Sequence, residues 1–158
     1  MTTQNYTAAF LFWRNEVLLV QKNSPEWQKG YLNAVGGKVE EGESYEAANL
    51  REFHEETGLE SETFAWRHFA TESGTAAEPS NTYQTHFFAA EAHPDEPRPE
   101  VPQANDVGER LIWAPSTLPP IPNAIGNLRW LIPLAVDWRS KELVTVVVHD
   151  SIADKPAW

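Results

Sequence analysis

One segment of the chain limits the possible folds more than any other feature: a helix pattern that lies between a glycine pair and a single glycine. The pair is Gly36-Gly37 and the single glycine is Gly58. Ser44 can accept a hydrogen bond from the first free amides of a helix, and Gly58 can adopt the left-handed conformation that ends one. These signals predict a helix from Ser44 to Thr57.

One face of this helix is acidic. At about 100° per residue, Glu52, Glu55 and Glu56 fall within an arc of roughly 100°. The opposite face is apolar and is expected to be buried; it consists of Ala47, Leu50 and Phe53. The helix is therefore expected to pack on the core through one side and to present three carboxylates on the other.

Three neighbouring carboxylates favour a bound cation if they lie in a cleft. Two unit charges about 4 Å apart repel by about 4 kcal/mol at an effective dielectric constant near 20. A set of ligands that are all oxygen suits Mg²⁺, with Mn²⁺ as a second choice, and such ions in turn bind phosphate groups. A solvated acidic helix face is the alternative interpretation of the three glutamates alone.

Composition excludes several other classes of protein. The chain carries 23 acidic and 12 basic side chains, a formal net charge of −11, which argues against binding of a nucleic-acid polymer. The absence of cysteine excludes disulfide frameworks, thiol nucleophiles and cysteine-bound metals. Apolar runs are far shorter than a membrane span and the first residues lack the features of a secretory signal, so we expect a cytoplasmic protein that does not enter a membrane.

The remaining pattern predicts one α/β domain over residues 1–158. A second helix is expected from Asn127 to Val136, and Arg14-Asn15 predicts a tight hairpin. Runs of β-branched and aromatic residues predict six strands: Tyr6–Trp13, Val17–Gln21, Phe64–Thr75, Thr82–Ala90, Arg110–Ala114 and Leu143–His149. This mixture favours a sheet that is covered by helices.

The acidic helix segment resembles the Nudix box. The box pattern is G-x5-E-x7-R-E-U-x-E-E-x-G-U, with U a bulky apolar residue. The chain meets it at Gly37, Glu43, Arg51, Glu52, Phe53, Glu55, Glu56, Gly58 and Leu59. The resemblance implies the family's α/β/α sandwich, a mixed sheet with the Nudix helix on one face. It also implies metal-dependent hydrolysis of a nucleoside diphosphate that is linked to another group.

The resemblance further implies a metal site. Glu52, Glu55 and Glu56 match the family's metal ligands, and in some members the residue at Glu52 instead orients or deprotonates the attacking water. The carbonyl of Gly36 matches a further ligand. Gly37 would let the backbone approach a phosphate without an intervening side chain.

Two box residues match supporting roles, and one more carboxylate is expected from outside the box. Arg51 matches the arginine that orients the neighbouring glutamate, and Glu43 matches the residue that braces the loop against the helix. A later loop commonly supplies a further ligand or base, and Glu109 is our first candidate. The others are Asp106, Glu91, Glu96 and Glu100.

Residues on either side of the box suggest a nucleotide substrate. The run from Trp27 to Lys38 resembles MutT-like nucleoside triphosphatases, in which the residue at Asn33 hydrogen-bonds the base. The run that begins at Ile121 is similar to their base-contacting turn, but Asn123 stands where those relatives carry an aspartate. An amide presents different hydrogen-bonding groups from a carboxylate, and both asparagines could equally be turn residues bonded to local backbone.

Trp27 and Lys38 complete the candidate substrate residues. Trp27 lies in a polar loop ahead of the expected phosphate site, so it could stack on a base, or it could cover a sheet edge or a partner in a homodimer. Lys38 could contact a phosphate or could simply be an exposed strand residue.

The sequence therefore predicts a Mg²⁺-dependent hydrolase of a nucleoside triphosphate or a modified nucleotide. A pyrophosphatase for ADP-ribose or a nucleotide-linked sugar is the alternative within the same family. A nucleotide-binding module that has lost catalysis is the alternative outside enzymes.

Overall fold

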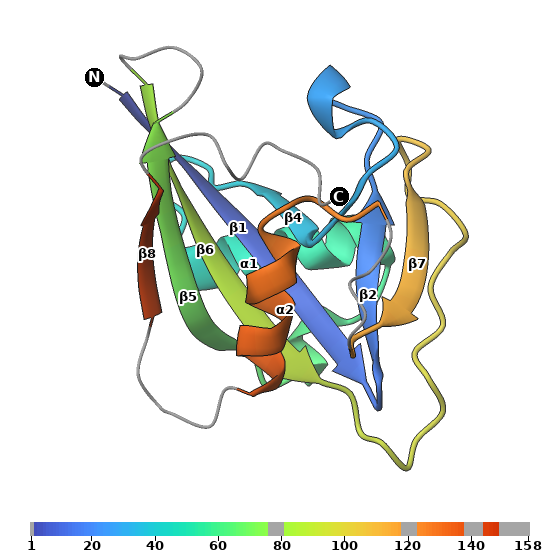
Figure 1. The fold of residues 1–158 in the computed structure, drawn as a ribbon. Coiled ribbons are helices and arrows are strands. Elements are labelled where there is room, and N and C mark those ends of the chain that lie inside the picture. Colours follow the sequence, from blue (N-terminus) through green and yellow to red (C-terminus); the bar gives the residue numbers. More distant parts are fainter. Residues whose placement is uncertain (1, 76–80, 118–122, 138–143, 149–158) are drawn as a thin grey trace.

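The computed structural model describes residues 2–75, 81–117, 123–137 and 144–148, and its eight strands form one sheet (Figure 1). The strands are β1 (Thr2–Trp13), β2 (Glu16–Gln21), β3 (Leu32–Asn33), β4 (Val35–Lys38), β5 (Arg67–Thr75), β6 (Asn81–Glu91), β7 (Arg110–Pro115) and β8 (Val144–Val148). The helices are α1 (Tyr45–Thr57) and α2 (Leu128–Val136), and two short 3₁₀ turns are η1 (Glu26–Gln28) and η2 (Ser61–Thr63).

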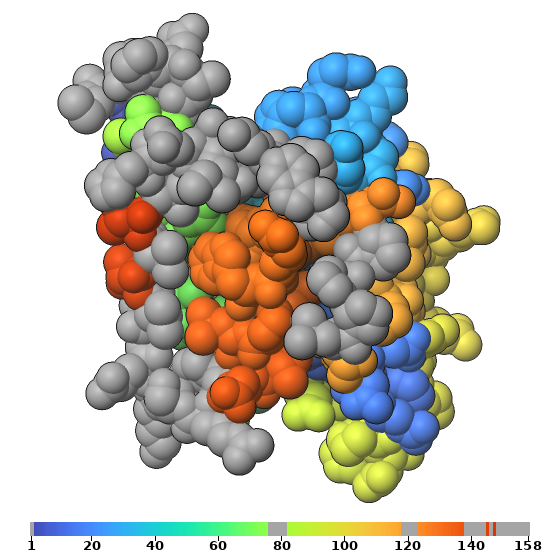
Figure 2. Space-filling view, viewed as in Figure 1, coloured from blue at the N-terminus to red at the C-terminus, as the bar shows by residue number. Residues whose placement is uncertain are grey.

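The sheet is mixed and β1 lies at its centre. β1 pairs in parallel with β6, from Thr2 opposite Asn81 to Phe12 opposite Glu91, and antiparallel with β2 and β4. The strand order is β3-β2-β1-β6-β5-β8, with β4 on β1 and β7 on β2. Helix α1 lies behind the sheet and α2 in front of it (Figure 1), and α2 covers the front face in the space-filling view (Figure 2). This arrangement confirms the predicted α/β/α sandwich.

Each face of the sheet has its own hydrophobic core, because successive side chains of a strand point to opposite faces. On β1, Phe10 belongs to the core under α2 together with Leu131, and Leu11 belongs to the core under α1 together with Phe53. All four side chains are completely buried. Because β1 is covered on both faces, its buried residues are nearly all apolar, as the continuous apolar run in the sequence indicates.

The predicted strands and helices are confirmed apart from their ends and two omissions. Strands β3 and β4 were not predicted, because two short segments rich in glycine have little strand propensity of their own. The hairpin at Arg14 is present, with φ of 51° at that residue. Leu143 and His149 lie outside the described residues.

The prediction that Phe64–Trp66 belongs to a strand was wrong, since β5 begins at Arg67 after η2. Phe64 and Trp66 are half-buried by contacts with α1 and not by strand pairing. The ring of Phe53 on α1 meets Phe64 at 6.2 Å and Trp66 at 4.8 Å, both edge to face. They pack on α1 and on the core between α1 and the sheet.

The helix face was also predicted incorrectly in part. Phe53 is buried as expected, but Ala47 is exposed and Leu50 is only half-buried. The buried positions of α1 are Ala48, Asn49, Phe53 and Thr57. The contact surface is therefore rotated toward Glu52 and Glu56, which brings these two carboxylates against the sheet.

No helix in the described part of the chain is long enough and apolar enough to cross a membrane.

Candidate active site

Both ends of helix α1 are fixed by the local signals that the sequence predicted. The side chain of Ser44 accepts a hydrogen bond from the Ala47 amide at 3.1 Å. At the other end Gly58 has φ of 72°, and its amide donates to the His54 carbonyl at 2.8 Å. The register of the glutamates along the helix is set by these two caps.

The glycine pair lies on β4, where it brings the backbone against both β1 and α1. Gly36 pairs with Ala8, and a Cβ on Gly36 would overlap the Thr7 carbonyl oxygen. A Cβ on Gly37 would overlap the carboxylate of Glu52. The Glu52 carboxylate thus rests directly on the Gly37 backbone, which only glycine permits.

Arg51 connects the helix with the loop before it. Its guanidinium donates to both oxygens of Glu43, at 2.8 and 2.9 Å, and to Glu52 Oε1 at 2.8 Å. It also donates to the Lys38 carbonyl at 3.0 Å and to Glu55 Oε2 at 3.3 Å. The hydrogen bonds from Arg51 hold the pKa of Glu43 down at about 2. The predicted orienting and bracing contacts are therefore present.

Glu56 is the most perturbed carboxylate of the segment. Burial raises its pKa to about 7, and the negative charges of Glu109 and Glu52 add to the effect, while Lys22 opposes it. Its Oε2 atom is buried and has no hydrogen-bond partner among the described residues. Buried acceptors are normally paired, so this atom is a candidate ligand for a cation.

Glu109 lies beside Glu56, as the electrostatic coupling between them shows. It is only 3% exposed. Its carboxylate accepts from the Asn23 amide at 2.9 Å and from Lys22 Nζ at 3.0 Å. Burial disfavours its charge, but these hydrogen bonds outweigh burial and lower its pKa. The other loop candidates are exposed: Asp106, Glu91, Glu96 and Glu100.

Glu55 differs from its two neighbours on the helix. Its side chain is 57% exposed and its described contact is the ion pair with Arg51. Within the described part of the chain, no three histidine or acidic side chains converge in an arrangement that is already shaped for a metal. The carboxylates are instead held by Arg51 and Lys22.

The residues nevertheless fit a divalent cation. Glu56 Oε2 accepts no hydrogen bond from the described residues, so it could bind a cation. Arg51 holds one oxygen of Glu52 and so fixes the direction of that carboxylate. Gly36 donates a backbone hydrogen bond to Glu56, so the strand and the carboxylate are in contact. An all-oxygen set of this kind suits Mg²⁺ or Mn²⁺.

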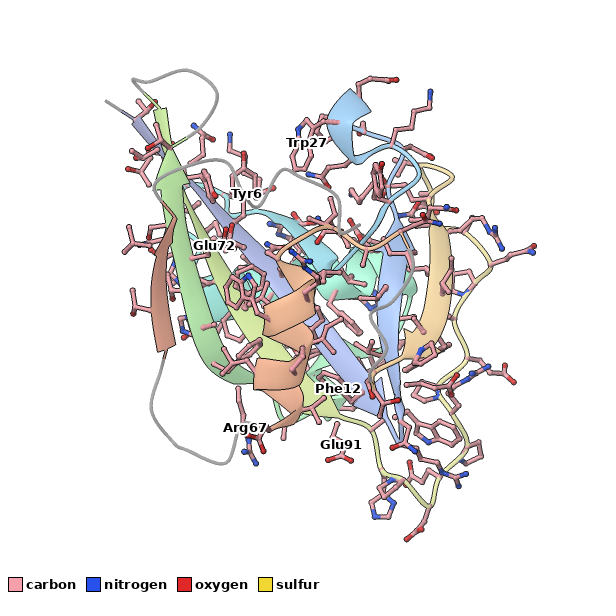
Figure 3. All side chains as sticks on the ribbon, in the orientation of Figure 1. Tyr6, Phe12, Trp27, Arg67, Glu72 and Glu91 are labelled. Atoms are coloured by element: carbon pink, nitrogen blue, oxygen red, sulfur yellow. The ribbon has the colours of Figure 1, made fainter. Side chains whose placement is uncertain are left out.

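A cavity of about 500 Å³ opens beside Gly36 and Gly37. Its wall includes Lys22 near the carboxylates and Asn33 on β3, and Trp27 from the loop before β3. Figure 3 shows Trp27, Tyr6 and Glu72 at this end of the molecule, with Arg67 and Glu91 at the other. A volume of this size accommodates a small-molecule ligand such as a nucleotide.

The predicted substrate residues fall in different places. Asn33 lines the cavity, but its amide already donates to Gln28 at 3.0 Å and accepts from the Ala34 amide at 2.8 Å. Asn123 is exposed with φ of 58°, and its carbonyl accepts from the amide of Leu32 on β3 at 2.7 Å. Lys38 is exposed and lines a separate groove beside the loop that precedes α1.

The cavity residues that sequence reasoning missed include Lys22, Glu72, Tyr83 and Asn127. Glu72 had a signal, since it is an acidic residue inside a predicted strand and such a position is usually either paired or functional. The others gave no signal, because their place in the wall depends on how distant strands pair.

A family model described as the NUDIX domain matches residues 3–131. The chain belongs to the Nudix family. Among curated proteins, this Nudix chain is 36% identical over 70 residues to the methanol dehydrogenase activator of Bacillus methanolicus. That match covers 44% of the chain and 38% of the relative, so it spans well under half the length of either.

Solved structures show the same Nudix fold. The mutator MutT protein of Bacillus halodurans is 22% identical with a TM-score of 0.66, and the match covers 94% of this chain and 92% of that one. The NUDIX domain of Shewanella oneidensis NrtR, solved with ADP ribose, is 20% identical with a TM-score of 0.69, over 89% of this chain and 90% of that one.

Proposed function

We propose that this Nudix protein is a Mg²⁺-dependent hydrolase that cleaves a phosphoanhydride bond of a nucleoside triphosphate or a modified nucleotide by attack of water at phosphorus. The observation that carries the proposal is the buried, unpartnered oxygen of Glu56 in contact with a glycine strand that borders a nucleotide-sized cavity. A solvated acidic helix face would have no reason to bury that oxygen.

One group of residues is assigned to phosphate binding and another to activation of water. Gly36, Gly37 and the cationic side chain of Lys22 line the part of the cavity where the phosphate oxygens would lie. Arg51 holds Glu52 by one oxygen. The other oxygen can orient the attacking water or accept its proton as the new P–O bond forms and the anhydride P–O bond breaks.

Glu52, Glu56 and the Gly36 carbonyl would hold the divalent ion, with Glu55 at the exposed side. When bound, this ion would neutralise negative charge that develops on the phosphoryl oxygens and would favour activation of water. Glu109 is assigned to positioning, because its oxygens are already bonded to Asn23 and Lys22.

The test is turnover of Glu55→Gln and Glu56→Gln variants with Mg²⁺ and a panel of nucleoside triphosphates. Both variants are expected to fold and to lose at least about 100-fold in kcat, because each lacks a charge that binds the ion. Glu60→Gln, an exposed change of the same charge just beyond α1, serves as the control. Rates near those of the unaltered protein in both site variants would refute these assignments.

Hydrolysis of ADP-ribose is the second candidate. It is favoured by the solved NUDIX domain of Shewanella oneidensis NrtR, which was crystallised with ADP ribose. The same residues would perform the same chemistry, so product analysis decides: AMP and ribose phosphate from ADP-ribose support this candidate, and pyrophosphate or phosphate from a triphosphate supports the first. Tight nucleotide binding with no product from either class would support a binding module.

A further inference from the structure

The end of the cavity away from the glycine pair holds a buried carboxylate that the proposed hydrolysis does not use. Glu72 lies on β5 and is 1% exposed, yet it lines the cavity. Its Oε1 accepts from the Tyr83 hydroxyl at 3.3 Å and its Oε2 accepts from Asn127 Nδ2 at 3.1 Å. Two donors from different elements thus fix the direction of this carboxylate.

Asn127 presents a second acceptor to the same place. It precedes α2 at the position where an asparagine oxygen usually caps the helix, but its side chain makes no capping bond. Its amide nitrogen donates to Glu72, so the amide oxygen, which is bonded to the same carbon, lies beside that carboxylate. That Oδ1 atom is buried and has no hydrogen-bond partner within the described ranges.

The wall around these groups suits a flat aromatic ring. Phe87, Ala8 and Ile125 supply apolar surface to the cavity. Trp27 and Tyr6 also line the cavity, and these two residues are 43% and 36% exposed. Figure 3 shows both at the same end of the molecule as Glu72. Exposed aromatic side chains beside a cavity are able to stack on a base.

We propose that Glu72 and Asn127 form the specificity-determining pair of this cavity and select a nucleobase that presents adjacent N–H donors, namely guanine. The proposal rests on the proposed function only in placing a nucleotide in the cavity. It assigns the phosphates to the Gly36-Gly37 end and the base to the Glu72 end.

Hydrogen-bond chemistry distinguishes guanine from adenine and cytosine. The edge of guanine carries the N1–H donor next to the N2 amino group, so two donors face the same direction. The corresponding edges of adenine and cytosine place a ring nitrogen acceptor beside the amino group, and that acceptor would face an oxygen of Glu72 or Asn127. Two buried acceptors that face each other make no hydrogen bond, and this costs binding free energy. Adenine and cytosine are therefore expected to bind more weakly than guanine.

The first test is binding of nucleoside monophosphates to the unaltered protein, measured by calorimetry without divalent ion. GMP is expected to bind at least about tenfold more tightly than IMP, which lacks the amino group, and than AMP. Equal affinity for the three within twofold, or no binding of GMP, would overturn the proposal. This comparison needs no variant and therefore does not depend on how a variant folds.

The second test is Glu72→Gln, which replaces one acceptor with a donor. Its affinity for GMP is expected to fall at least about tenfold, while its weaker affinity for AMP does not fall, because an amide donor can pair with the ring nitrogen of adenine. Glu91→Gln, the same change at an exposed site at the opposite end of the molecule, is the matched control. A folded Glu72→Gln protein that keeps the full preference for GMP would overturn the proposal.

The two proposals fail separately. Selective GMP binding without hydrolysis of any nucleotide would remove the hydrolase and leave the guanine site. Hydrolysis of several triphosphates at similar kcat/KM, with equal binding of GMP, IMP and AMP, would remove the guanine site and leave the hydrolase.

Discussion

At the scale of single residues, the site depends on a missing side chain as much as on those present. The Glu52 carboxylate occupies the space that a Cβ on Gly37 would need. The same carboxylate is held by Arg51 at 2.8 Å. Its position is thus set from two sides, by a bare backbone and by a guanidinium.

Gly37→Ala is expected to displace the Glu52 carboxylate and to lower kcat at least about 100-fold, because misplacement of a reacting group by about 1 Å has effects of that size. The backbone at Gly37 does not need a positive φ, so the fold should persist. Measurement of kcat together with thermal unfolding and circular dichroism checks both parts. A folded variant with unchanged kcat would contradict the role given to this contact.

At the scale of elements, Arg51 joins α1 to the strand and loop before it. It bonds Glu43 in the loop, the Lys38 carbonyl on β4 and two glutamates of its own helix. Lysine carries the same charge, but a single ammonium cannot reproduce the planar set of donors. The identity of the cation therefore matters and not only its sign.

Arg51→Lys is accordingly expected to lower both the melting temperature, by several degrees, and kcat, because Glu52 loses its fixed partner. Arg129→Lys makes the same change at an exposed site on α2 and provides the control. The prediction is wrong if Arg51→Lys retains both the melting temperature and the turnover of the unaltered protein.

A second contact between elements makes stability depend on pH. His86 on β6 is 5% exposed and stacks on Tyr45 of α1, with ring centroids 3.5 Å apart. Burial and the nearby His68 lower the pKa of His86 to about 4, although Glu46 opposes this. Burial lowers the pKa of His68 as well. Both imidazoles are therefore kept neutral in the fold.

At His86 the unfolded chain binds a proton near pH 6.5 and the folded chain does so only near pH 4, so stability falls as the pH is lowered through this window. Between pH 7 and pH 5 the unaltered protein is expected to lose about 2 kcal/mol more unfolding free energy than His86→Phe. Urea unfolding of both proteins at the two pH values measures the difference, and any titration of Glu56 cancels because both proteins contain it. Equal losses would show that His86 is not held neutral.

At the scale of the whole molecule, a net charge of −11 and a buried carboxylate cluster both act against the compact state. A cation that binds only the folded chain would relieve part of this repulsion. The proposed function therefore predicts that the ion stabilises the fold, and this stabilisation can be measured without any substrate.

Mg²⁺ at ten times its dissociation constant is expected to stabilise the protein by about 1.4 kcal/mol and to raise its melting temperature by a few degrees. The double variant Glu52→Gln and Glu56→Gln should show no such rise. The double variant Glu60→Gln and Glu62→Gln has the same net charge at exposed sites and should respond as the unaltered protein does. Equal responses of the two double variants would indicate general screening and no site.

The sequence by itself determined the helix with its two caps, the fold family and the order of the glutamates. These features depend on residues a few positions apart, where capping and helical periodicity act directly. The resemblance to the Nudix box also predicted that Arg51 orients Glu52, and the two side chains are in contact.

Only the tertiary structure decided which glutamates are buried, and why. Glu52 and Glu56 face the sheet and Glu55 faces solvent because β4, which has little strand propensity of its own, pairs with β1 and places Gly37 under the helix. Glu72 and Asn127 meet across 55 positions of the chain. Contacts of that range arise from strand pairing and layer packing, which local residue patterns do not encode.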